Sequence, residues 1–119
     1  MNTIRVVKLF DDPVLLAPEK GEELCSRIKA AIKRFGSAKV DFSGYKFLST
    51  SFLNRAFGQL CIDMDIDADE FQKKVEISNL SEDDMDDLEL AIDNAQFRRK
   101  LINQGVKDLG EYFATRLPA

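Results

Sequence analysis

Three consecutive hydroxyl-bearing residues, Ser49, Thr50 and Ser51, have the types and spacing best suited to chemistry in this sequence. They precede a segment whose apolar residues have helical spacing, so we expect them at the start of a helix. The first turn of a helix leaves backbone N–H groups unpaired and carries about half a positive charge, which favours a phosphate there. A phosphate on Ser51 would add roughly −1.5 to −2 charges. Arg55 could pair with it one turn along the helix. The pattern therefore predicts a surface switch at Ser51.

The same residues have plainer interpretations. One of the hydroxyls could serve only as a helix cap, which would leave the protein a structural or scaffold subunit, for example a homodimer. The exposed helix end could instead accept the phosphates of a nucleotide. Phe52 is equally open, because it could pack inward against the sheet or stand exposed as an anchor for a partner.

Other kinds of chemistry find little support in the sequence. The chain contains no histidine, which removes the usual general base near neutral pH and the imidazole metal ligands. Its six glycines form no phosphate-binding loop. The alternating aspartates Asp63, Asp65, Asp67 and Asp69 have the spacing of a calcium loop but lack its glycine, so we expect a solvated loop and a helix start. We therefore predict no enzyme, no catalytic residue, no metal site and no cofactor.

These observations favour a small interaction domain that binds a protein partner through the junction. The contact residues would be Ser49, Thr50, Ser51, Phe52 and Arg55. A net charge of −4 argues against nucleic acid as a partner. The sequence has neither a secretory signal nor an apolar run long enough to span a bilayer, so we expect a cytoplasmic protein with no membrane contact. Cys25 and Cys61 lie among apolar residues and should be buried, reduced thiols.

The remaining pattern alternates strands with helices. We expect strands over residues 3–10, 38–42 and 75–79, with an ambiguous fourth over 14–17. Helices should cover residues 18–36 and 50–64, one or two turns within 65–74, and a long stretch from the Ser81 cap to about residue 103. Residues 106–119 could form a last short strand or a docking helix.

This order predicts an α/β fold in which a single small mixed β-sheet is packed by about three to four helices. Right-handed β-α-β crossovers would make neighbouring strands parallel. A chain of 119 residues is long enough for one domain with its own core, so we assign residues 1–119 to a single domain.

The stretch Asp41–Leu53, DFSGYKFLSTSFL, resembles the STAS domain family of bacterial anti-sigma-factor antagonists. Asp41, Ser43 and Gly44 match the family's strand-to-turn motif, and Phe47-Leu48 matches its apolar pair. Ser51 falls on the serine that a partner kinase phosphorylates in the family. Two positions depart from the pattern, since Ser49 replaces an aspartate and Phe52 replaces a glycine.

A longer pattern is similar to a STAS-like group of bacterial proteins of uncharacterised function. It comprises Ser49, Ser51, Phe52, Phe57, Gly58 and Leu60, followed by VEISNLSEDD from Val75. The resemblance extends from about Val40 to Ile92. It implies a STAS-like fold, a non-enzymatic regulatory role in bacteria, phosphorylation of Ser51, and a histidine-kinase-like ATPase as the protein partner.

Overall fold

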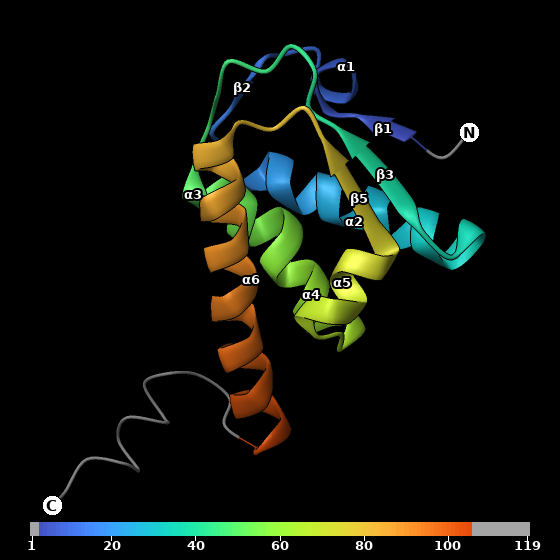
Figure 1. Ribbon diagram of the computed structural model, residues 1–119, viewed down its shortest axis with the longest axis vertical. Helices are drawn as coiled ribbons and strands as arrows, with labels where there is room; N and C mark the ends of the chain where they lie inside the picture. The colour runs from blue at the N-terminus through green and yellow to red at the C-terminus, as the bar shows by residue number, and fades with distance from the viewer. Residues whose placement is uncertain (1–2, 106–119) are drawn as a thin grey trace, which may run out of the picture.

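Three short parallel strands form the main sheet. They are β1 (Thr3–Arg5), β3 (Ala38–Asp41) and β5 (Val75–Ser78), in the order β1-β3-β5 (Figure 1). The computed structural model describes residues 3–105. Parallel neighbours need long crossover connections, and helices supply them here. The predicted α/β class and the parallel pairing of neighbouring strands are therefore confirmed.

A second sheet contains only β2 (Val14–Leu15) and β4 (Phe47–Leu48), which are also parallel. The prediction of one mixed sheet was therefore wrong, since both sheets found within residues 3–105 are parallel throughout. The reason lies in the turn after β3, where Gly44 has a φ of 85°. After this turn the chain leaves the main sheet, and β4 pairs with β2 instead.

Five helical stretches surround the sheets in the described part of the chain, one more than the upper end of the predicted range. They are α1 (Val6–Phe10), α2 (Pro18–Phe35), the continuous run α3 (Thr50–Leu53), η1 (Asn54–Gly58) and α4 (Gln59–Met64), then α5 (Ala68–Lys74) and α6 (Glu82–Asn103). The run from α3 to α4 is called the 50–64 helix below. Its bounds agree with the prediction, and its middle is a π-helical turn.

The unexpected helix is α1, which replaces the second half of the strand predicted over residues 3–10. Arg5 is paired with Asp41, and β3 ends at Asp41. Residues after Arg5 therefore have no ladder partner, and their backbone groups must find hydrogen bonds elsewhere. They form one short helical stretch that buries Val6 and ends at Asp11 in the left-handed conformation.

The 50–64 helix is the centre of the hydrophobic core. Its inward side chains are completely buried: Phe52, Leu53, Ala56, Phe57, Leu60 and Cys61. The Phe57 ring contacts Phe42 at 6.2 Å and Phe71 at 5.9 Å between centroids. This helix packs against both α2 and α6, and α2 passes behind β3 and β5 in Figure 1. Among the described residues, no helix is both long and apolar enough to cross a membrane.

Gly21 allows α2 to approach the 50–64 helix closely. A Cβ atom added at Gly21 would lie 2.7 Å from the carbonyl oxygen of Phe52 and 2.8 Å from Cβ of Arg55. Gly58 meets α6 less tightly, since a Cβ there would lie 3.4 Å from the carbonyl oxygen of Ala91. Of these two glycines, Gly21 is therefore the one that lacks the space for a methyl group.

We expect Gly21→Ala to lower the free energy of unfolding by about 1–3 kcal/mol, because the backbone it would strike cannot move aside cheaply. This loss should exceed the gain of about 1 kcal/mol in helix propensity. Gly58→Ala is the matched control and should be neutral or stabilising. Urea denaturation of both variants tests this, and equal effects would contradict the assignment of Gly21 as the tight contact.

Candidate functional site

Ser49 joins the two-stranded sheet to the 50–64 helix. Its Oγ accepts a hydrogen bond from the Phe52 backbone N–H at 3.0 Å and donates one to the Leu16 carbonyl at 2.8 Å. Its backbone N–H also donates to the Leu15 carbonyl at 3.1 Å. Ser49 is therefore the N-cap, and it ties the helix start to the strand next to it.

Unlike Ser49, both Thr50 and Ser51 are exposed in the first turn of the helix. Within residues 3–105, no hydrogen bond in the structure uses either hydroxyl. Because Ser49 alone caps the helix, Ser51 keeps a solvent-accessible Oγ at its positive end. The structure thus places Ser51 where an approaching molecule can reach it.

Phe52 points into the core, with its side chain fully buried. The inward alternative is therefore confirmed, and Phe52 cannot be an exposed anchor for a partner. Helical geometry explains which side chains are buried and which are exposed, because steps of about 100° per residue place positions 52, 53, 56 and 57 on one side. The exposed positions Ser51, Asn54 and Arg55 fall on the other side.

Arg55 is already engaged by another helix. Its Nη1 atom forms an ion pair with Oε1 of Glu22 on α2, and both side chains are more than half exposed. A pair this exposed contributes little stability, about 0–1 kcal/mol. Arg55 therefore lies on the same outer side as Ser51 and could change partner at small cost.

Two exposed apolar side chains flank the junction. Leu16 is 50 % exposed and Phe47 is 65 % exposed. Leu16 follows β2 and accepts the Ser49 hydrogen bond, and Phe47 lies in β4. Sequence reasoning missed this surface because it treated Phe47-Leu48 only as an apolar pair. Side chains alternate along a strand, so Phe47 and Leu48 point to opposite faces, and the structure leaves Phe47 on the exposed one. We call Leu16, Phe47, Thr50, Ser51 and Arg55 the junction surface.

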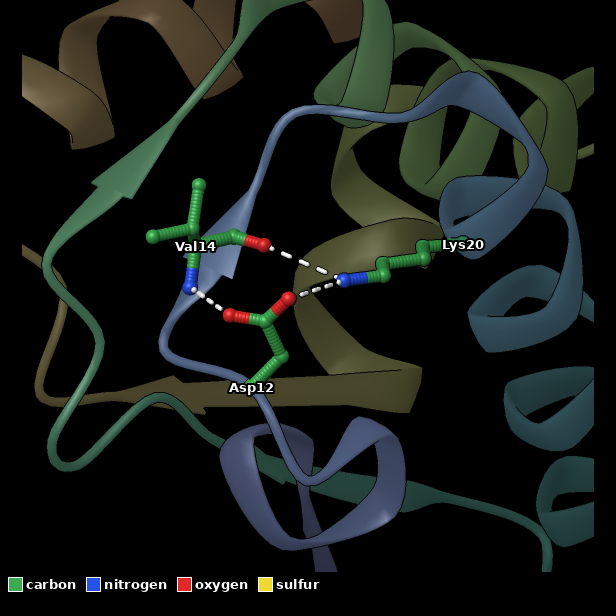
Figure 2. Close-up of polar contacts among 3 residues, drawn as sticks. All are labelled: Asp12, Val14 and Lys20. Atoms are coloured by element: carbon green, nitrogen blue, oxygen red, sulfur yellow. Dashed lines mark hydrogen bonds and ion pairs between the residues drawn. The ribbon is translucent and has the colours of Figure 1, made fainter.

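A lysine clamp holds the strand beside the junction in place (Figure 2). The Nζ of Lys20 donates to Oδ2 of Asp12 at 2.8 Å and to the Val14 carbonyl at 3.2 Å. The other oxygen, Oδ1 of Asp12, accepts from the Val14 N–H at 2.9 Å. The hydrogen bond from Lys20 lowers the pKa of Asp12 below its usual value. The first turn of α2 is thereby fixed to β2, and β2 is paired with β4.

The turn after β3, which carries the motif that resembles STAS domains, is held by a network of hydrogen bonds. Oδ1 of Asp41 accepts hydrogen bonds from the Ser43 N–H at 2.9 Å, the Ser43 hydroxyl at 2.8 Å and Nδ2 of Asn79 at 2.7 Å. The bond from Asn79 is the largest cause of a lowered pKa at Asp41. The Tyr45 hydroxyl donates to Asp84 at 2.6 Å and accepts from the Ser81 N–H at 3.0 Å. These bonds join the carboxyl ends of β3 and β5 to the start of α6.

The cysteines that the sequence singled out are buried, and Asp63, Asp65 and Asp67 are bonded within the protein. Cys25 and Cys61 are buried free thiols, as predicted, and burial raises their pKa to about 11 and about 12. The aspartates of residues 63–69 point to different partners. Asp63 pairs with Lys29 of α2, Asp65 pairs with Arg99 of α6, and Asp67 caps α5.

Comparison with known proteins identifies one family. A family model described as a STAS-like domain of unknown function (DUF4325) matches residues 20–85, which is more than half of the chain. This range runs from α2 to the start of α6 and contains Ser51. The search of curated proteins and the search of solved structures returned no match.

We expect Ser49→Ala to lower the free energy of unfolding by about 1–2 kcal/mol, because it removes the helix cap and the bond to Leu16. Ser51→Ala should change it by less than about 0.5 kcal/mol, since that side chain is exposed. Urea denaturation measures both. A loss at Ser51 as large as that at Ser49 would show that the two serines share the capping role.

Asp41→Asn should lower the melting temperature at neutral pH and lose this effect in acid. The pKa of folded Asp41 lies below its usual 3.8, so its ionised form stabilises the fold above that value. The contribution disappears as the pH falls through the folded pKa. The difference between wild type and variant should therefore shrink below about pH 4 in thermal melts. The exposed control Asp86→Asn should leave the melting temperature nearly unchanged at neutral pH, and a pH-independent loss at Asp41 would contradict the role of its charge.

Proposed function

The chain belongs to the family of STAS-like domains of unknown function, and on this basis we propose that it is a non-enzymatic regulatory domain that binds a protein partner through the junction surface. The observation that carries the proposal is the placement of Ser51, which is exposed at the start of a helix whose opposite face is buried. Leu16, which is bonded to Ser49, and Phe47 of the adjoining strand β4 add exposed apolar area near the helix start. Apolar area around an accessible polar centre is typical of an interface.

Phosphorylation of Ser51 would switch this interaction. A phosphate at the first turn is favoured by the helix dipole and by unpaired backbone N–H groups. It would also compete with Glu22 for Arg55, because phosphate carries more charge than a carboxylate and accepts paired hydrogen bonds from a guanidinium. The buried side of the helix would be unaffected. A partner surface fitted to the neutral serine would then be repelled while the fold remains intact.

The partner that fits this scheme is a histidine-kinase-like ATPase, as the resemblance of Ser51 to the phosphorylated serine of STAS domains implies. Such a kinase would transfer the γ-phosphoryl group of ATP to Oγ of Ser51, release ADP and take up the serine proton on its own base. We place this exchange in the bacterial cytoplasm, where ATP is available and the two buried thiols stay reduced. The scaffold alternative is weaker because Ser49 alone accounts for capping.

Ser51→Asp should abolish binding to the partner ATPase and leave the melting temperature within about 2 °C of wild type. A carboxylate in the first turn is tolerated or slightly stabilising, by about 0.3–1 kcal/mol. Isothermal titration calorimetry and a thermal melt measure the two quantities on the same samples. Ser26→Asp is the matched control, because Ser26 is an exposed serine of α2 and the net charge changes equally.

Phosphate-affinity electrophoresis of the protein co-expressed with the ATPase provides the direct test. We expect one slower-migrating species, and we expect Ser51→Ala to remove it while Thr50→Ala does not. Unchanged binding by Ser51→Asp, together with no phosphorylated species, would refute the proposal.

A further inference from the structure

A second surface lies between α5, β5 and α6, and it shares no residue with the junction surface. These three elements enclose a groove of about 420 Å³. In Figure 1, α5 follows the lower end of α4 and leads into β5. Residues of α5 also contact α6. The groove has an apolar lining from all three elements, formed mainly by Phe71, Val75, Ile77, Met85, Leu88 and Ile92.

The α6 side of this groove carries a strong negative charge. Residues 82–93 contain seven acidic residues and no lysine or arginine. Two of the acids, Glu89 and Asp93, line the groove itself and are exposed. None of the seven forms an ion pair with another residue of the described range 3–105. On its α6 side the apolar floor is therefore bordered by carboxylates that form no such ion pair, whereas α5 brings Lys73 and Lys74 near the other side.

We propose that this groove binds a cationic amphipathic helix of a protein partner. A helix of this kind would place its apolar side chains on the floor and its lysines or arginines against Glu89 and Asp93. The lining residues of α6 extend from Met85 to Asp93, about 12 Å or two helical turns. Pairing with a partner strand fits less well, because β5 offers an edge of only four residues.

Charge also favours this occupant over two others, namely residues 106–119 of the same chain and a second copy of the protein. Residues 106–119 of the same chain lie outside the described residues and contain Lys107 and Arg116 but also Asp108 and Glu111, so they bring no net charge. A second copy, related by two-fold symmetry, would set the acidic border against itself. The surface therefore favours a separate, positively charged segment.

The test uses the full chain and a fluorescein-labelled peptide of about 18 residues, long enough for five helical turns, built from leucine and lysine in amphipathic order. Fluorescence anisotropy should show saturable binding that weakens as salt rises. A scrambled peptide of the same composition and a peptide with glutamate in place of lysine should bind at least about tenfold more weakly. Hydrogen exchange should show protection confined to the three elements that line the groove, α5, β5 and residues 85–93 of α6.

Two groove variants separate charge from apolar contact. The double variant Glu89→Lys/Asp93→Lys should raise the Kd by about tenfold or more at low salt. Its control, Glu19→Lys/Glu23→Lys, makes the same change in net charge on exposed positions of α2 and should change the Kd by less than about twofold. Met85→Gln keeps the side-chain shape and the net charge and should still weaken binding severalfold.

Three results would overturn the proposal. One is equal weakening by the α2 control, which would mean that net charge alone attracts the peptide. Another is no binding by the full chain at any salt concentration. The third is sedimentation that shows a dimer dissociated by Glu89→Lys/Asp93→Lys, since the groove would then hold a second copy. Each readout is independent of Ser51 phosphorylation, so failure here leaves the proposed function untouched.

Discussion

The burial of one side of the 50–64 helix is the constraint on which the rest of the structure depends. Phe52, Leu53, Phe57 and Leu60 have no exposed area, and their helix packs against α2 and α6 in one core cluster that includes Val40 of β3. Burying a large apolar side chain contributes about 1.5–3 kcal/mol, so rotating this helix would be very costly. Its outer side is therefore fixed, and with it the position of Ser51.

The polar groups around this helix serve two purposes that can be separated. Ser49 satisfies the helix start and holds β2, and Asp41 organises the turn after β3. The side chains of Ser49 and Asp41 are therefore already hydrogen-bonded within the protein. Ser51 and Arg55 are peripheral, since the first has no described partner and the second has only an exposed one. A charge change at the periphery can therefore alter the surface without disturbing the network beneath it.

The two surfaces differ in chemistry. The junction surface combines apolar side chains with a serine and an arginine, whereas the groove beside α6 combines apolar side chains with carboxylates. They lie on different elements, but they are linked through the 50–64 helix, whose outer side carries Ser51 and Arg55 and against which α6 packs. Taken together, the two proposals give one domain with separate surfaces for two partners of different charge.

Local patterns in the sequence determined the α/β class, the bounds of the 50–64 helix, the Ser81 cap and the burial of both cysteines, because helical spacing and capping depend on near neighbours. They also selected Ser51, through its place in a motif. Tertiary structure alone decided that α1 replaces strand, since only the end of β3 at Asp41 deprives residues 6–10 of a ladder partner. It also decided the inward position of Phe52, the engagement of Arg55 by Glu22, and the exposure of Phe47. Each of these depends on which distant segment packs alongside, and the spacing of residue types within one segment does not determine that.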